Sequence, residues 1–245
     1  METYLAYFDI LGFKDFIYNT AQDEIDFKFD CLLRDSQSSI TDDKFISDLY
    51  GGLVPDLKQS RVNCLHVSDS IIFWTSGVSK EQFAHIIDVS NDFFQCCCVN
   101  QTFPVRGCIV KGIISFDPFT IKSQKELKFI NSSIYGKALI DAYIKAELQE
   151  WAGCYIDKSV FEGIDEIEIN ALIASGKILK YPVPFKDQIV KEEFTIKMIG
   201  EKRDNISEID VQKLFTQHLG NNPITTSIQK KLDNTLKYFK YIKQL

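Results

Sequence analysis

An apolar and aromatic run near the start of the chain, Tyr4–Phe8, leads directly into an acid and then a glycine, in the string YLAYFDILGFKDF. A strand without polar alternation is typical of a central strand that is buried on both faces. We therefore predict a strand that ends at Asp9 and a short helix over 14–20. At the turn, Gly12 would let backbone N–H groups approach an oxyanion. Asp9 could equally be only the cap of that helix.

A second acid lies in the turn of a predicted β-hairpin. Two runs rich in β-branched and aromatic residues, 62–67 and 71–74, are separated by Ser68-Asp69-Ser70, a composition that suits a tight turn. An acid at such a tip is often only a turn former. Two acids beside adjacent strands would also make an oxygen site for Mg²⁺ or Mn²⁺, which bind one or two carboxylates and take other ligands from substrate phosphates.

Four strings resemble, in the same order, motifs of the class III nucleotidyl cyclases. FDILGF resembles their first metal-binding motif, and VSDSIIF resembles the hairpin with the second metal aspartate. FPVRGCIVKGII resembles the strand after the dimerisation helix, and SSIYGKALIDAYIKAELQEWAGCYIDKSVF resembles the next glycine, helix and closing strand. The resemblance covers roughly residues 1–161 and implies a metal site at Asp9, Ile10 and Asp69 for two divalent cations, Mn²⁺ or Mg²⁺.

The expected fold class is α+β. The resemblance implies a ferredoxin-like βαββαβ palm, which is a mixed or antiparallel sheet with helices on one face. We expect a cyclase-like catalytic domain over 1–200 and a C-terminal helical extension over 201–245. The polar, Lys-rich segment 117–131 reads as a loop or flap.

The predicted helix over 137–150 departs from the family pattern. Class III cyclases have an Asn and, four residues later, an Arg on this helix, which steady the ribose and the transition-state charge. The ungapped positions here are Ile140 and Ile144. One residue further along, Asp141 and Lys145 keep the spacing and face the same way, so the resemblance suggests them as catalytic residues. They could also be a common surface ion pair.

The positions that select a purine base differ as well. Adenine-selective members have a Lys four residues before the second metal aspartate and an Asp three before the helix glycine, where this chain has Leu65 and Ser133. Without those groups adenine would leave its edge unpaired, which is costly in a dry pocket. An apolar pocket with one hydroxyl could instead bind a pyrimidine. The chain thus resembles the pyrimidine cyclases of the bacterial Pycsar anti-phage system, which make cyclic UMP or cyclic CMP for a separate effector; UTP is favoured over CTP.

The remaining substrate contacts follow from the same resemblance. Backbone N–H groups near Gly12 and Phe13, assisted by Lys14, would bind the triphosphate. Lys186 matches a late-hairpin lysine of related cyclases, although a solvated turn lysine is the simpler interpretation. Arg106, on the predicted strand over 104–116, could reach phosphate or only solvent. Sites in this fold lie between subunits, so a head-to-tail homodimer is implied, with the metals from one chain and the helix cation from the other.

Composition narrows the classes of partner. The net charge of −6 and a pI near 5.2 disfavour a nucleic-acid surface, which would need a basic stripe. No run approaches the roughly 20 apolar residues that span a bilayer, and no signal peptide is visible, so we expect a cytoplasmic protein without membrane contact. Two alternatives stay open: a degenerate cyclase-like domain that only binds a nucleotide or a protein, and oligonucleotide synthesis of the palm-polymerase type.

Overall fold

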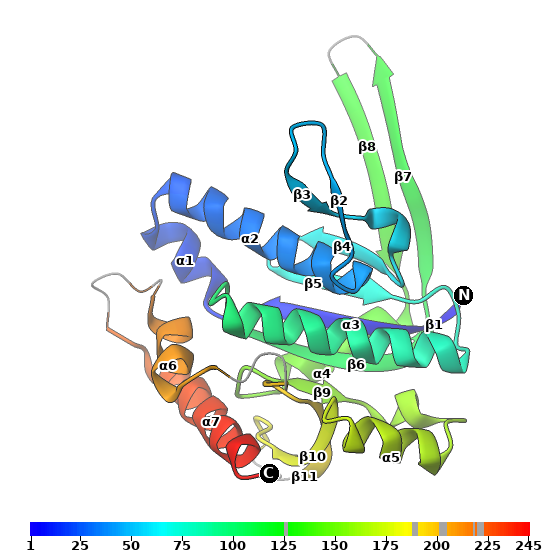
Figure 1. Cartoon of the computed structure of the whole chain (residues 1–245). Helices are drawn as coiled ribbons and strands as arrows, with labels where there is room; N and C mark the ends of the chain where they lie inside the picture. The colour runs from blue at the N-terminus through cyan, green and yellow to red at the C-terminus, as the bar shows by residue number, and fades with distance from the viewer. Residues whose placement is uncertain (125–126, 188–190, 201–204, 218, 220–222) are drawn as a thin grey trace.

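A seven-stranded sheet forms the centre of the molecule (Figure 1). In spatial order its strands are β10 (Ile178–Val183), β11 (Lys191–Ile196), β9 (Cys154–Ile156), β6 (Val105–Ile113), β1 (Glu2–Ile10), β5 (Ser70–Trp74) and β4 (Asn63–Val67). Neighbouring strands are antiparallel except β6 and β9, which are parallel. This computed structural model describes residues 1–124, 127–187, 191–200, 205–217, 219 and 223–245.

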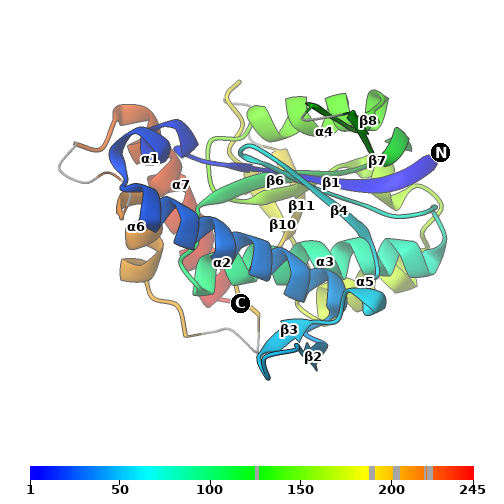
Figure 2. The ribbon, with the colours of Figure 1, turned by 90° about the horizontal axis from the view of Figure 1, so that it is seen from above.

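Helices cover both faces of the sheet (Figure 2). They are α1 (Phe13–Asn19), α2 (Gln22–Thr41), α3 (Lys80–Val99), α4 (Lys137–Glu147), α5 (Glu166–Ala174), α6 (Glu208–Thr216) and α7 (Thr226–Lys243), with 3₁₀ turns η1 (Leu57–Gln59) and η2 (Lys158–Phe161). The larger core contains buried residues of α1, α2, α3, α6 and α7, whereas α4 packs against a smaller core on the opposite face. The predicted α+β cyclase-like class is confirmed, but α4 departs from the expected arrangement with helices on one face.

Small residues explain how α4 covers the second face. Ala138, Ala142 and Ala146 recur every four residues and are almost fully buried, so one stripe of the helix lies close to the sheet. A Cβ placed on Gly112 of β6 would lie only 3.1 Å from the Cβ of Ala138. The close approach of this helix to β6 therefore depends on glycine and alanine.

The central position predicted for the first strand is confirmed. β1 lies between β5 and β6, and its even-numbered side chains from Tyr4 to Ile10 face the larger core. The odd-numbered Leu5 and Tyr7 face the smaller core beneath α4. The strand runs one residue beyond Asp9, because Asp9 and Ile10 still pair with β6.

One segment was predicted wrongly. Residues 117–131, expected to be a loop or flap, lie mostly in a hairpin of β7 (Ser115–Gln124) and β8 (Leu127–Tyr135) that projects from the body (Figure 1). These two strands form a separate sheet and pair only with each other. Such pairing requires no alternation of apolar residues, so the polar composition hid it. A second small hairpin joins β2 (Phe45–Ser47) and β3 (Leu53–Pro55).

The last helix is firmly attached to the body of the protein. The Tyr238 hydroxyl donates to the carbonyl oxygen of Ile196 at 2.7 Å, and its ring centroid lies 4.6 Å from that of Trp151. The backbone N–H of Ala152 donates to the Thr235 hydroxyl at 2.8 Å. The predicted boundary at residue 200 stays a prediction. Among the described helices, none is long and apolar enough to cross a membrane.

Candidate active site

A cleft of about 510 Å³ opens where β1 ends and the chain turns into α1. Residues from several separate parts of the chain line it: Tyr7, Asp9, Ile10, Leu11, Gly12, Phe13, Lys14, Asp69, Ser70, Arg106, Tyr143, Glu147, Lys186 and Lys231. Seven of the predicted site residues are in this set, namely Asp9, Ile10, Gly12, Phe13, Lys14, Asp69 and Lys186. The structure therefore brings most of the predicted metal and phosphate residues into one place.

The two predicted metal acids meet in this cleft because their strands are neighbours. Asp9 of β1 pairs in register with Ser70, the first residue of β5, and Asp69 precedes it in the turn. The N–H of Ile10 donates to the carbonyl oxygen of Asp69 at 3.0 Å, which ties the hairpin turn to the end of β1. The Asp69 side chain is half-buried and has no hydrogen bond or ion pair with the described residues.

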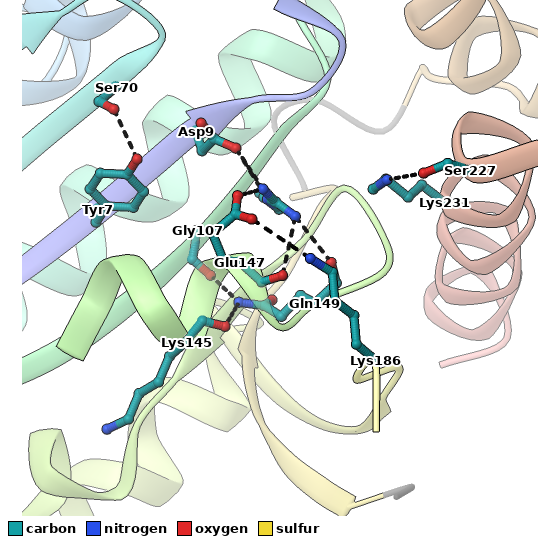
Figure 3. A network of polar contacts seen from close by, with 11 residues as sticks. Tyr7, Asp9, Ser70, Gly107, Lys145, Glu147, Gln149, Lys186, Ser227 and Lys231 are labelled. Carbon is teal, nitrogen blue, oxygen red and sulfur yellow. Dashed lines mark hydrogen bonds and ion pairs between the residues drawn. The ribbon is translucent and has the colours of Figure 1, made fainter. Parts of the chain in front are cut away.

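Asp9 forms an ion pair with an arginine of the neighbouring strand (Figure 3). The Nε and Nη2 atoms of Arg106 donate to the Asp9 Oδ2 atom at 3.2 and 2.9 Å. The other oxygen, Oδ1, has no hydrogen-bond partner in the described part of the chain. The alternative role of Asp9 as a helix cap is wrong, since Gly12 is the N-cap of α1 and no side chain caps it.

The environment of Asp9 disfavours its negative charge. Burial raises the pKa of this carboxyl to about 6, against the opposing effect of the Arg106 charge, and the nearby Asp69 charge raises it further. The side chain is 13% exposed, so little water compensates the ionised form. A bound cation would supply the missing compensation, which makes Asp9 suited to ligate a metal.

The turn after Asp9 has a glycine, Gly12, where a side chain would otherwise cover the backbone. Gly12 has φ 77°, a left-handed conformation that favours glycine, and a Cβ there would meet no atom within 4 Å. The backbone of this turn is thus open to the cleft. The Ile10 side chain is 3% exposed and belongs to the core, so only its backbone carbonyl could ligate a metal.

The sequence analysis did not propose six of the residues that line the cleft: Tyr7, Leu11, Ser70, Tyr143, Glu147 and Lys231. Glu147, at the end of α4, is in ion-pair contact with Arg106 and lies 3.6 Å from Lys186. The Tyr7 hydroxyl is 2.8 Å from the Ser70 hydroxyl, and burial raises the pKa of Tyr7 to about 12. Tyr7 could have been found, because period two puts it on the same face of β1 as Asp9.

Four predicted residues do not line the cleft of this chain. The Lys145 amino group donates to Asp157 at 2.7 Å rather than to Asp141, and Figure 3 shows it pointing away from Asp9. The surface ion pair considered for Asp141 and Lys145 is therefore wrong. Leu65, on β4, is half-buried against the smaller core, and Ser133, on β8, pairs in register with β7.

The donor set fits a divalent cation of the magnesium type. Among the described residues no group of three or more His, Cys, Asp or Glu side chains converges as a metal site. Mg²⁺ and Mn²⁺ need only one or two carboxylates when a substrate phosphate completes the shell. Asp9 and Asp69 provide these, and the cleft leaves room for a phosphate-bearing ligand.

Solved nucleotide cyclases have the same fold. The structure matches the guanylyl cyclase Cya2 with a TM-score of 0.52 and 9% identity, covering 84% of this chain and 96% of that one. It matches the guanylate cyclase domain of RhGC from Catenaria anguillulae in complex with GTP with a TM-score of 0.51 and 10% identity, over 80% and 95% of the two chains. The adenylyl cyclase CyaB from P. aeruginosa gives 0.50 and 12%, over 84% and 97%.

The sequence itself gives no comparable match. No model of a known family matches the chain. No curated protein matches it either. At identities of 9–12% the similarity establishes the fold alone, and that fold is the one of class III nucleotidyl cyclases.

Proposed function

We propose that the protein is a nucleotidyl cyclase that converts a pyrimidine nucleoside triphosphate, UTP in preference to CTP, into the 3′,5′-cyclic monophosphate and pyrophosphate. One observation carries this proposal: Asp9 and Asp69 converge in a single cleft of a chain with the cyclase fold. The open carboxylate of Asp69 and the free Oδ1 atom of Asp9 are the atoms that such chemistry needs.

Asp9, Asp69 and the carbonyl group of Ile10 would hold two divalent cations, Mn²⁺ or Mg²⁺. When bound, these cations supply charge compensation to the triphosphate and lower the pKa of the ribose 3′-hydroxyl. Arg106 has a positioning role, since its two bonds to Oδ2 fix the Asp9 carboxylate within the cleft. The pairing of β1 with β5 does the same for Asp69.

The other end of the cleft is suited to the triphosphate. The 3′-oxygen attacks the α-phosphorus in line, and charge then develops on the departing pyrophosphate. Backbone N–H groups at Gly12 and Phe13, together with Lys14 and Lys186, would stabilise this charge. Lys186 is held near the cleft by Glu147, with Nζ 3.6 Å from the carboxylate. We therefore prefer a phosphate role for Lys186 to that of a solvated turn lysine.

The site would be completed by a second copy in a head-to-tail homodimer. Ile140 and Ile144 of α4 and its C-cap residue Leu148 are apolar and 57%, 48% and 43% exposed. Such an unpartnered apolar stripe supports a protein interface. The partner subunit's Lys145 and the partner subunit's Asp141 would act on the ribose and the transition-state charge. Lys145 would first have to exchange its 2.7 Å contact with Asp157 for the substrate.

The pyrimidine preference rests on residues outside the cleft of the single chain. The partner subunit's Leu65 and the partner subunit's Ser133 would frame the base with one apolar side chain and one hydroxyl. Neither offers the paired donors and acceptors that a purine edge requires. The cyclic product would act on a separate effector protein in anti-phage defence.

The test is incubation of the purified protein with Mn²⁺ and each of the four nucleoside triphosphates, with products identified by mass spectrometry. We expect cyclic UMP in excess over cyclic CMP and no cyclic purine nucleotide. Asp69→Asn should abolish the product while the oligomeric state persists. Asp30→Asn, which changes an exposed acid of α2, is the matched control and should retain full turnover. Full turnover by Asp69→Asn would contradict the metal role.

A catalytically degenerate binding domain is the second candidate. It is favoured by one observation, the missing Asn and Arg at the positions of Ile140 and Ile144. In that case none of the four nucleotides would yield a cyclic product, although nucleotide binding would persist and depend on Asp69. Linear products would instead indicate oligonucleotide synthesis.

A further inference from the structure

We propose that Lys231, on the C-terminal helix α7, is a phosphate-binding residue of the cleft and contacts the polyphosphate end of the nucleotide. This inference rests on the proposed function and extends it to a part of the chain outside the region of family resemblance. A lysine on α7 would make the C-terminal helix part of the substrate site.

The position of Lys231 is the first argument. It lines the cleft that contains Asp9 and Asp69. It also lines a smaller cavity of about 50 Å³, between α1, α6 and α7, whose walls include Gly12 and Ile228. Both cavities place Lys231 beside the turn at Gly12, where the triphosphate is proposed to bind. Figure 3 shows its amino group on the side of α7 that faces Asp9 and Glu147.

The second argument is the rigidity of the helix that bears this lysine. Leu232, the next residue, is buried in the larger core. One turn later, the Asn234 amide donates to the carbonyl oxygen of Glu150 at 2.9 Å, and Thr235 accepts from the backbone N–H of Ala152. These contacts fix the backbone of Lys231 relative to the sheet, so its side chain is presented to the cleft from a constant position.

The third argument is an unbalanced charge. The Lys231 amino group donates to Ser227 Oγ at 2.8 Å, and in the described part of the chain no carboxylate lies within ion-pair distance of it. The preceding lysine, Lys230, differs, because it pairs with Glu150 at 3.2 Å. Burial lowers the pKa of Lys231, Glu150 opposes this, and the positive charges of Arg106 and Lys186 lower it further.

Like charges at one end of a cleft are unfavourable until an anion joins them. Glu147 contacts both Arg106 and Lys186, so its single charge is already shared between two cations. Asp9 and Asp69 are the proposed metal ligands, so they are not available to Lys231. A polyphosphate has the charge density to satisfy the remaining cation, and an ammonium is a suitable point-charge donor to phosphate oxygens. The chemical class of the ligand is therefore a nucleoside triphosphate, recognised through its β- and γ-phosphates.

The experiment compares Lys231→Gln with Lys237→Gln in the full chain. Lys237 is an exposed lysine of the same helix, outside the cleft, so both variants remove one charge from α7. The probe is inorganic tripolyphosphate, measured by calorimetry without metal. Loss of one charge-assisted hydrogen bond should weaken binding about 10- to 100-fold for Lys231→Gln. Lys237→Gln should bind as the wild type does, and Lys231→Arg should restore most of the affinity.

Two results would overturn the inference. One is equal tripolyphosphate affinity for the wild type and Lys231→Gln, with an unchanged melting temperature; undetectable binding by the wild type counts the same way. The other is an equal loss in both glutamine variants, which would indicate only a general charge effect. If cyclisation occurs, Lys231→Gln should raise KM for the nucleotide more than it lowers kcat.

The outcomes also separate this inference from the proposed function. If no nucleotide is cyclised but tripolyphosphate binding depends on Lys231, the cyclase assignment fails and the phosphate site stands. If cyclisation proceeds in Lys231→Gln with wild-type KM and kcat, the phosphate site fails and the cyclase assignment stands.

Discussion

The two faces of β1 are built for different tasks, although both are covered by helices. On the even-numbered face, Phe8 packs among the rings of Phe73 and Phe93. On the odd-numbered face, the apolar pattern ends at Tyr7, and Asp9 follows with its charge in a poorly hydrated position. One face of the strand thus contributes packing to the core, whereas the other ends in the carboxylate of Asp9 at the cleft.

Because the two faces differ, substitutions on them should affect different properties of the protein. Substitutions on the even face remove packing, so they should lower the free energy of unfolding without a specific effect on pH dependence. Substitutions at the end of the odd face remove a charge that the fold tolerates at a cost. Those should change function and pH dependence and leave packing largely intact.

The largest effect on stability is expected for Phe8→Ala. Phe8 is fully buried, and its ring centroid lies 5.0 Å from that of Phe93. Truncation of a buried phenylalanine costs about 3–5 kcal/mol of the free energy of unfolding. Urea denaturation of the variant and the wild type would measure this loss. The control is Phe27→Ala, which removes an exposed ring of α2 and should change stability by less than about 0.5 kcal/mol. Similar losses in the two variants would break the distinction between core and surface.

A smaller, pH-dependent effect is expected for Asp9→Asn without metal. The folded-state pKa of about 6 lies above the ordinary 3.8, so between these values the folded protein binds more protons than the unfolded chain. The wild type should therefore lose unfolding free energy as the pH rises through this window, by about 3 kcal/mol at most. The asparagine variant lacks this loss, so its relative stability should increase from pH 4.5 to 7.5.

Measurement of both proteins at each pH removes other titrations from this difference. Burial lowers the pKa of His66 to about 4, which gives the opposite slope, but it does so in both proteins. A stability difference that stays constant between the two pH values would show that Asp9 is not held at a raised pKa.

The smallest effect is expected for the hydroxyl pair at the middle of the odd face. Tyr7→Phe removes the 2.8 Å hydrogen bond to Ser70 and should cost about 1 kcal/mol. Ser70→Ala should cost a similar amount, and the double variant should cost no more than either single one, as a double-mutant cycle would reveal. Strictly additive losses would mean that the two hydroxyl groups act independently.

Local patterns placed the two predicted metal acids, Asp9 and Asp69, at the ends of neighbouring strands. A short turn between two β-rich runs places Asp69 at a strand end, and strand-to-glycine patterning does the same for Asp9. The central position of the first strand followed from its continuous apolar run. These features depend on residues close to one another in the chain, and the structure confirms the strand positions. The metal role of the two acids stays a prediction.

Long-range partners could not be predicted in this way. Period two places Arg106 on the face of Cys108 and Val110, as observed, but only the β1–β6 register reveals that it lies opposite Asp9. Glu147 is contributed by the end of a helix whose register on the sheet depends on alanine packing. Lys231 is contributed by a helix outside the region of sequence resemblance, so neither spacing nor resemblance could place it at the cleft.

The attachment of α7 affects how the protein could be shortened for crystallisation or assay. A fragment that stops at residue 200, the predicted end of the catalytic domain, would leave Trp151 without the contact of its ring with that of Tyr238. Removal of the buried side chains of Leu232, Phe239 and Ile242 would expose an apolar surface on the remaining chain. Such a fragment should aggregate on expression, so an inactive truncated preparation would say nothing about the catalytic competence of the intact chain.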